Sequence, residues 1–291
     1  MDNLRGIIFV IVAMAGFTIE DMFIKQLSAT LPVGQILIVL GIGSGAIFAT
    51  LSLLKGESLI RRQIWQPMFL WRALSEAIAA ICFATALSLV DISVVASVFQ
   101  ATPLVITMGA ALFLGEKVGW RRWSAIFIGF IGVLMIIRPG LDGFDPNALL
   151  VLGSVLFVTV RDLITRKIAA DISSTVISFQ GFAALIPAGI ILLWMTGEHA
   201  QSTGSTELWM LLGGVIFGAI GYYGIVQGMR LGDAAVVTPF RYTRLLFSLL
   251  VGIIVFQETP DALTLIGAAL IISTGLFTFL RERQLAKAKL A

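Results

Sequence analysis

The sequence predicts an all-α membrane protein that crosses the bilayer many times. Of its 291 residues, 58% are apolar and only 13% are charged, and the mean hydropathy is +0.99. Soluble domains are about half apolar and a quarter charged, so a soluble fold of this length could not bury this much apolar surface. The apolar residues form long runs separated by short gaps, which leave no room for a soluble domain.

Ten of these runs have the length of a membrane-spanning helix, which needs about 20 apolar residues. They lie at residues 4–27, 33–54, 67–89, 92–114, 120–138, 147–168, 173–195, 207–230, 234–256 and 262–281. The first run carries Glu20 and Asp21 and lacks a small-residue cleavage site, so we expect a retained span rather than a signal peptide. Pro103, Pro187 and Pro239 fall within spans, where proline breaks the backbone ladder and marks kinks.

The basic residues predict the orientation, because cytoplasmic loops of membrane proteins are enriched in Lys and Arg. With the N-terminus inside, 14 of the 20 basic residues fall on the cytoplasmic side, two (Lys25 and Arg138) fall outside, and four lie within spans. We therefore expect both termini to be cytoplasmic. The basic residues are not clustered on a polar domain, so the net charge of +3 indicates no nucleic-acid partner. One Cys and one His do not make a transition-metal site.

An internal repeat is visible at a nearly constant offset. "DISVVASVFQATPLVITMGAALFLGE" (91–116) aligns with "DAAVVTPFRYTRLLFSLLVGIIVFQE" (233–258) at an offset of 142. In the first span of each half, Asp21 matches Asp162 at an offset of 141. The chain therefore reads as five spans that were duplicated.

Because five is odd, the second copy must cross the membrane in the opposite sense to the first. Such inverted repeats are typical of secondary transporters, which bind substrate at the repeat interface near the midplane. We expect two five-helix repeats, residues 1–140 and 141–291, in one integral membrane transport domain around a central cavity.

Two stretches carry a family resemblance: "FLGEKVGWRRWSAIFIGFIGVLMIIRPG" (113–140) and "FQETPDALTLIGAALIISTGLF" (256–277). In each, a Glu (Glu116 or Glu258) closes the fourth helix of a half, and a loop and a Gly-containing apolar helix follow. With ten spans as five plus five, the chain resembles the EamA-like branch of the drug/metabolite transporter superfamily. The members that it resembles most are bacterial inner-membrane exporters of amino acids and related metabolites.

The resemblance implies a basket of ten helices, with spans one to four and six to nine around the cavity and spans five and ten at the periphery. It also implies alternating access without ATP hydrolysis and without a cofactor. The sequence has no phosphate-binding GxxxxGK[ST] loop, which agrees with this.

Two arginines in the ninth span are the leading candidates for a substrate site. Arg241 and Arg244 share a helix face, about 11 and 15 Å from the cytoplasmic start of that span. A charge at a span centre costs about 2.5–3.5 kcal/mol and is kept only where it faces protein or water. Guanidinium groups bind carboxylates through two hydrogen bonds, so the pair could clamp a substrate carboxylate. The alternative is interhelical pairing with Glu76 or Asp162.

Other polar residues within the spans are candidates for the same cavity. Arg72 and Glu76 form an i,i+4 pair in the third span, where Glu76 could hold an ammonium, carry a proton or neutralise an arginine. The cavity wall is expected to include Tyr222, Tyr223, Gln227, Phe99, Gln100 and Tyr242. Packing or interhelical hydrogen bonding is the alternative for each.

Two charged pairs are candidates for gates. Asp21 and Lys25 lie toward the outer end of span one, and Arg161 and Asp162 lie toward the inner end of span six. Repeat-related positions at opposite faces are where an alternating-access transporter would place its gates. The alternative is ordinary i,i+4 pairing at helix ends, Asp21 with Lys25 and Asp162 with Arg166.

We therefore expect an inner-membrane secondary transporter that exports small zwitterionic or anionic metabolites, foremost amino acids. An organic-anion or sugar-phosphate exchanger of the same fold is the alternative, since two arginines would also serve it. An intramembrane enzyme is disfavoured because no nucleophile is paired with a base, and a channel because no ring-forming filter sequence occurs. The expected partners are the substrate and the bilayer, with the protein a monomer or homodimer.

Overall fold

The computed structural model describes residues 2–59, 66–115, 118–141, 144–167, 173–231 and 237–290, and these ranges contain helices and loops but no strand. The helices are α1 (Asp2–Leu27), α2 (Val33–Leu54), α3 (Pro67–Leu89), α4 (Ile92–Phe99), α5 (Thr102–Phe113), α6 (Trp120–Ile137), α7 (Ala148–Lys167), α8 (Ser174–Thr196), α9 (Ser205–Leu231), the 3₁₀ helix η2 (Thr238–Tyr242), α11 (Thr243–Val255) and α12 (Ala262–Leu290). The predicted all-α membrane fold is thereby confirmed.

Within the described ranges, nine helical segments are long and apolar enough to cross a membrane. They correspond to nine of the ten predicted spans, with α4 and α5 together forming the fourth. The predicted ninth span, 234–256, begins outside the described residues and continues as η2 and α11. Its described part is thus not one regular helix.

Two of the three prolines predicted to break a span do so. The fourth span is interrupted at Gln100 and Ala101, just before Pro103, and η2 contains Pro239 in its first turn. Proline lacks the N–H that a helix interior needs, so it is tolerated where a new helical segment begins. Pro187 instead lies inside α8, which continues through it to Thr196.

The two interruptions lie at equivalent places in the halves. The junction between α4 and α5 is at 100–101, and the junction between η2 and α11 is at 242–243, which is an offset of 142. This is the offset at which the two sequences align.

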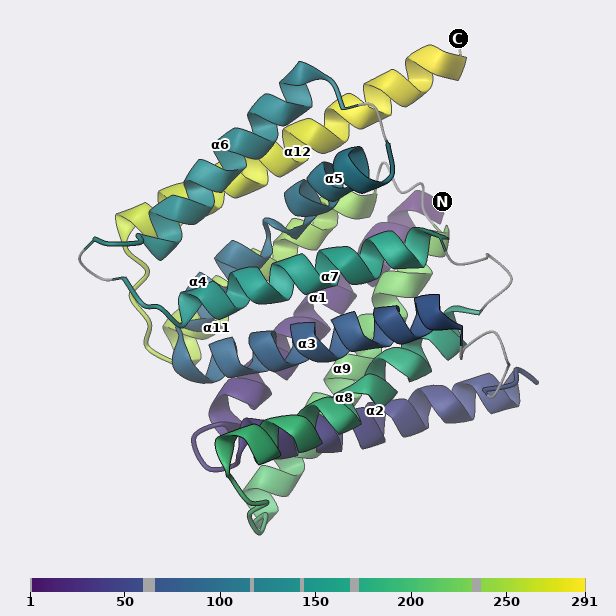
Figure 1. The fold of residues 1–291 in the computed structure, drawn as a ribbon, viewed down its shortest axis with the longest axis vertical. Coiled ribbons are helices and arrows are strands. Elements are labelled where there is room, and N and C mark those ends of the chain that lie inside the picture. Colours follow the sequence, from purple (N-terminus) through teal and green to yellow (C-terminus); the bar gives the residue numbers. More distant parts are fainter. Residues whose placement is uncertain are drawn as a thin grey trace.

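Helices pair across the two halves of the chain. α1 packs along α9, α2 along α8, α3 along α7, and α6 along α12 (Figure 1). α4 and α11 contact each other, and both contact α1. A two-fold relation between five-helix halves gives this pairing, because it exchanges the α1–α9 pair with the α3–α7 pair. α6 and α12 lie together at one edge, as the family resemblance implies for spans five and ten.

Close helix contacts depend on glycine. A Cβ added to Gly34 of α2 would lie 2.5 Å from the carbonyl oxygen of Gly189 in α8, and one added to Gly132 of α6 would lie 2.7 Å from that of Gly267 in α12. Small residues let helix backbones approach closely where no hydrophobic effect drives association.

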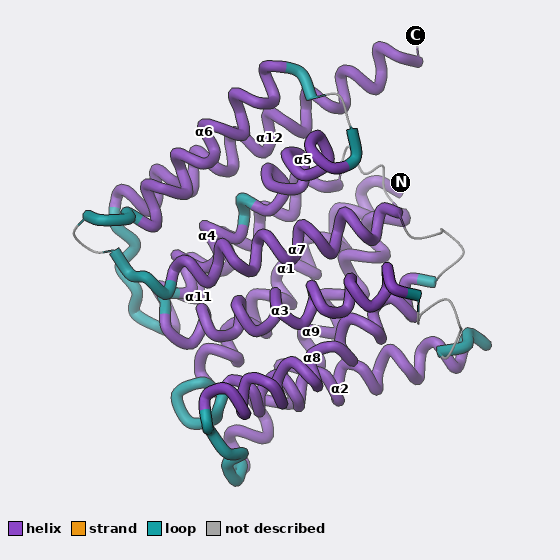
Figure 2. Tube along the Cα trace, viewed as in Figure 1, coloured by secondary structure: helices purple, strands orange, loops and turns teal. Residues whose placement is uncertain are grey.

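The connecting loops lie at the two ends of the bundle (Figure 2), and both chain termini lie at the same end (Figure 1). We call this the termini end, and the other the opposite end. At the opposite end, Arg138 after α6 pairs with Asp261 before α12, with an N–O distance of 2.5 Å. Hydrogen bonds from the Thr264 backbone N–H and from Arg138 lower the pKa of Asp261 to about 2. This pair joins the two peripheral helices.

Large apolar side chains cover the outside of the bundle. Four of the six tryptophans are more than 60% exposed, and each lies near a helix end. They are Trp71, Trp120, Trp194 and Trp209. Exposed tryptophans at helix ends are typical of the two membrane interfaces.

Candidate functional site

The Arg244 guanidinium of α11 is already paired. Its Nη2 donates to Oδ2 of Asp21 in α1, with an N–O distance of 2.7 Å. It also lies over the rings of Phe17, Phe83 and Phe99, at 5.2, 5.5 and 5.3 Å from their centroids. Three aromatic faces and one carboxylate therefore satisfy this cation.

This pairing differs from both sequence-based alternatives for Arg244. The expected partners were a substrate carboxylate, Glu76 or Asp162, and the structure places Asp21 there instead. The reason is that α11 packs against α1, so that the two side chains meet. The Asp21 carboxylate is consequently not available to Lys25, and their expected i,i+4 pair does not form.

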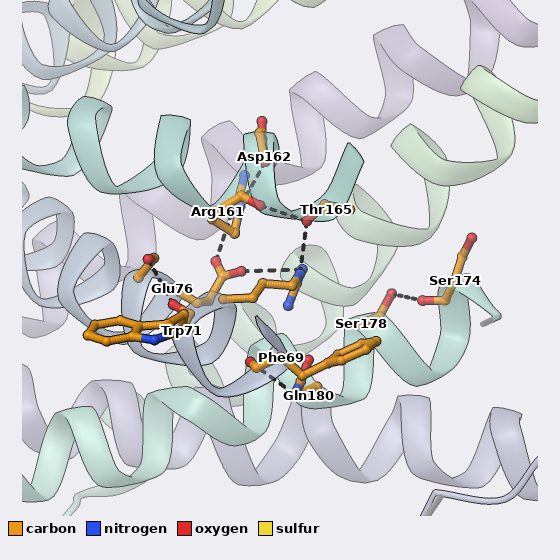
Figure 3. A network of polar contacts seen from close by, with 11 residues as sticks. Phe69, Trp71, Glu76, Arg161, Asp162, Thr165, Ser174, Ser178 and Gln180 are labelled. Carbon is orange, nitrogen blue, oxygen red and sulfur yellow. Dashed lines mark hydrogen bonds and ion pairs between the residues drawn. The ribbon is translucent and has the colours of Figure 1, made fainter. Parts of the chain in front are cut away.

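A second charged network joins α3 and α7 (Figure 3). Arg161 donates from Nη1 to Oε1 of Glu76 at 2.7 Å and from Nε to Oδ1 of Asp162 at 2.9 Å. The predicted Arg72–Glu76 pair is present, with an N–O distance of 3.7 Å, and Arg72 Nε donates to Thr165 at 3.0 Å. Glu76 thus neutralises two arginines. The other expected pair, Asp162 with Arg166, lies outside the described side chains.

This network is not fully satisfied. Arg72 Nη1, Glu76 Oε2 and Gln180 Oε1 are buried and have no hydrogen-bond partner among the described residues. Gln180 of α8 donates from its amide nitrogen to the Phe69 carbonyl oxygen, at 3.4 Å (Figure 3). Buried polar atoms without partners indicate places where water or a ligand can bind.

Arg241 is the exception among the arginines of the interior. Its side chain is exposed, and none of the ion pairs within the described part of the chain involves it. The charges that act on it most are Asp162 and Arg161 of α7 and Arg244 of its own span. Its exposed side chain thus lies among the charges of α7 and of its own span without an ion-pair partner among the described residues. Its guanidinium is therefore free to meet a ligand.

Gln100 and Phe99 lie beside the two arginines, as predicted. Gln100 donates from Nε2 to the backbone oxygen of Arg241 at 3.3 Å. The Phe99 ring packs edge-on against Phe83, with 4.9 Å between centroids, and faces Arg244. The interrupted fourth span thus presents one polar and one aromatic group to the interrupted ninth span.

Two of the predicted wall residues point elsewhere. Tyr222 packs against Phe48 and Phe182, with centroid distances of 5.7 and 5.6 Å. The Tyr242 hydroxyl points at Gly275 of α12, where an added Cβ would collide with it. Neighbours in sequence along an irregular helix face different directions, so Tyr242 is buried while Arg241 is exposed.

Tyr223 and Gln227 line a small recess at the termini end, between α2, α8 and α9. Lys55, Ser174, Thr175 and Ser178 also belong to its polar lining. Beside it, Glu57 accepts hydrogen bonds from Ser173 at 2.7 Å and Thr175 at 3.0 Å. Burial opposes ionisation of Glu57, but these hydrogen bonds prevail and lower its pKa.

Lys25 lies near the opposite end of the bundle, in the last turn of α1. Its Nζ donates to the carbonyl oxygens of Leu87 at 3.3 Å and Val90 at 2.5 Å, at the C-terminus of α3. A cation is stabilised there by the unpaired carbonyls and the helix dipole. Lys25 also lies 3.9 Å from the Glu258 carboxylate. It therefore ties α1 to α3 and to the segment after α11.

Glu258 caps the start of α4. Its carboxylate accepts hydrogen bonds from the backbone N–H groups of Ile92 at 2.7 Å and Ser93 at 3.0 Å, and from the Ser93 hydroxyl at 2.7 Å. This gives a structural reason for the acidic residue in the second family stretch. The corresponding Glu116 of the first half lies outside the described residues.

Sequence reasoning missed the two other rings around Arg244. Phe17 could have been found, because it lies four residues before Asp21 and so shares its helix face. Phe83 gave no signal among the many apolar residues of its span. No group of metal-ligating side chains occurs in the ranges that the structure describes.

Comparison with known proteins identifies a family and several relatives. The EamA-like transporter family matches twice, over residues 4–138 and 146–280. A riboflavin transporter of Rhizobium johnstonii is 32% identical over 216 residues, which cover 73% of this chain and 71% of that protein. An S-adenosylmethionine uptake transporter of Rickettsia conorii is 28% identical over 198 residues, 68% of this chain and 66% of that protein. This chain thus spans just under two thirds of the Rickettsia protein.

Two further matches cover nearly the whole chain. The pseudopaline exporter of Pseudomonas aeruginosa is 24% identical over 268 residues, 92% of this chain and 93% of that protein. One solved crystal structure has a TM-score of 0.64 at 19% identity and covers 94% of this chain and 98% of that one. At this identity the likeness concerns the fold.

Proposed function

Because the chain belongs to the EamA-like transporter family, it is a multi-pass membrane transporter and not an enzyme, and we propose that it moves a small organic solute with one carboxylate by alternating access. In this proposal the membrane is the bacterial inner membrane, and the termini end of the bundle is cytoplasmic. The relatives are named for uptake as well as export. Net direction is therefore proposed to follow the solute gradient, with export where the solute accumulates inside.

The free Arg241 guanidinium is the observation that carries this proposal. A buried or membrane-embedded cation without a partner is costly and is retained where a ligand or water meets it. Arg161 and Arg244, its two cationic neighbours, already have carboxylate partners. A carboxylate fits the remaining guanidinium, because the two groups form parallel hydrogen bonds.

The same count of charges favours one substrate class over the alternative. A sugar phosphate brings about two negative charges, and the interior offers it one free guanidinium rather than the two expected from sequence. A monocarboxylate or a zwitterion matches one free cation. Since relatives are named for S-adenosylmethionine and pseudopaline, we propose that substrates extend beyond plain amino acids to larger metabolites that carry a carboxylate.

Transport into proteoliposomes tests the proposal. The panel contains labelled amino acids, S-adenosylmethionine, riboflavin, dicarboxylates and sugar phosphates, each with and without a pH gradient. We expect carboxylate-bearing solutes to be transported and Arg241→Gln to lower their transport roughly tenfold or more, the usual cost of losing a charged hydrogen bond. Arg121→Gln, at an exposed position near the start of α6, is the matched control and keeps wild-type transport.

Two results would contradict the proposed substrate class. One is transport of sugar phosphates in preference to all carboxylates. The other is a transported carboxylate whose rate is the same in the wild type and in Arg241→Gln.

A further inference from the structure

The two halves treat one repeat-related pair of positions differently. At the offset of 141, Glu20 in α1 corresponds to Arg161 in α7, and at the offset of 142, Glu76 in α3 corresponds to Gly218 in α9. The α1–α9 contact is thus the counterpart of the α3–α7 contact. One contact contains an arginine and a glutamate, and the other contains a glutamate and a glycine.

The geometry of the two contacts reflects this difference. Between α3 and α7, Arg161 and Glu76 form an ion pair at 2.7 Å. Between α1 and α9, the Glu20 carboxylate lies against Gly218, where an added Cβ would lie 2.4 Å from Oε1 and 2.7 Å from Cδ. The glycine makes room for the carboxylate but supplies no opposite charge.

Glu20 has no cationic partner among the described residues. None of the ion pairs or hydrogen bonds of the described side chains involves it, and its side chain is only partly buried. The charges that act on it are Asp21 and Arg244, which are already paired with each other. Lys25, further along α1, is bound to the end of α3. Glu20 is therefore the unpaired acidic counterpart of the unpaired Arg241.

We propose that Glu20 forms a second subsite, which binds the cationic group of the substrate, an ammonium or a similar organic cation. This rests on the proposed function, because Arg241 then binds the carboxylate of the same molecule. Both groups lie within electrostatic reach of Arg244, and Glu20 directly precedes Asp21, the partner of Arg244, in α1.

The balance of charge supports a zwitterionic substrate. The central parts of the spans hold the arginines Arg72, Arg161, Arg241 and Arg244 and the carboxylates Glu20, Asp21, Glu76 and Asp162. Once the described ion pairs have formed, one arginine, Arg241, and one carboxyl group, Glu20, remain unpaired. A zwitterion satisfies both without adding net charge to the membrane interior.

Three matched probes test the two subsites separately. Phenylalanine carries both charged groups, phenethylamine only the cation, and 3-phenylpropionate only the anion. Binding to the purified full-length protein is measured by calorimetry. We expect Glu20→Gln to weaken phenethylamine binding at least tenfold and to leave 3-phenylpropionate unchanged. Arg241→Gln shows the reverse, and Glu198→Gln, in the exposed loop after α8, binds all three like the wild type.

A second variant changes the room available to the Glu20 side chain and leaves its charge unaltered. Gly218→Ala puts a methyl group where the Glu20 carboxylate lies, so cation binding weakens while anion binding stays. The subsite is contradicted if the wild type binds no cationic probe or if Glu20→Gln binds phenethylamine as the wild type does. It is equally contradicted if Glu20→Gln changes only the response to a pH gradient, which would make Glu20 a proton site. If Arg241→Gln bound 3-phenylpropionate as the wild type does, while Glu20→Gln still weakened phenethylamine binding, the proposed function alone would be overturned.

Discussion

At the scale of single residues, four arginines in the interior have distinct environments. Arg244 is held by Asp21 and three aromatic rings, and Arg161 by two carboxylates. Arg72 is almost wholly buried and shares Glu76 with Arg161. Of these four arginines, Arg241 is the one whose side chain is exposed and forms no ion pair with a described residue. Depth in the membrane, which is greater for Arg244 than for Arg241 in the predicted span, therefore does not identify the unpaired group.

The Asp21–Arg244 pair is expected to be a structural requirement. Asp21→Asn leaves a buried guanidinium with reduced compensation, and breaking a buried pair costs about 3–5 kcal/mol. We expect a clear loss of thermal stability of the purified protein in detergent. Arg244→Gln alone should also destabilise it, because Asp21 is then left as a buried, unpaired anion.

The double variant distinguishes this account from independent roles. When Asp21→Asn and Arg244→Gln are combined, neither charge is unpaired, so the loss should be smaller than the sum of the two single losses. Strict additivity of the melting-temperature changes would show that the two side chains do not depend on each other.

At the scale of elements, the interrupted fourth and ninth spans position the candidate site. α4, α5, η2 and α11 bring Phe99, Gln100, Arg241 and Arg244 together because both spans change direction at equivalent places. Proline at each interruption was visible in the sequence. The direction of each side chain after the interruption was not, because a 3₁₀ turn rotates residues differently from an α-helix.

The cap on α4 is a testable element-level feature. Glu258→Ala removes the acceptor for the N–H groups of Ile92 and Ser93, and a lost N-terminal cap costs about 1 kcal/mol. We expect amide hydrogen exchange at the start of α4 to become roughly fivefold faster, with α2 and α8 unaffected. Glu198→Ala is the control. Unchanged exchange in α4 would mean that the cap does not hold this helix.

At the scale of the whole molecule, composition and periodicity predicted most of the fold. The apolar runs predicted the span positions, and the repeat offset predicted two related halves, whose interrupted spans are also separated by 142 residues. The orientation of the termini and the exact division at 140–141 remain predictions. Pairing between helices could not be predicted from single residues, because which side chains meet depends on the relative depth of neighbouring helices. This explains why Asp21, and not Glu76 or Asp162, is the partner of Arg244.

The whole molecule joins its halves through pairs whose two members come from different repeats. α1 is tied to α11 by the Arg244 pair, and α3 to α7 by the Arg161 pair. Lys25 and Glu258 add a connection at the opposite end. A substrate that bridges Glu20 and Arg241 would add one more connection between the halves. Because these two side chains are unpaired, it could bind them without breaking an existing ion pair.

The central claim is that Arg241 contacts the carboxylate of the substrate. A cycle that combines a change in the protein with a change in the ligand tests it directly, by measuring the affinity of 3-phenylpropionate and its carboxamide for the wild type and for Arg241→Gln. The account predicts that the carboxamide binds the wild type tenfold or more weakly, while Arg241→Gln binds both compounds equally. A carboxamide penalty of the same size in both proteins would contradict it.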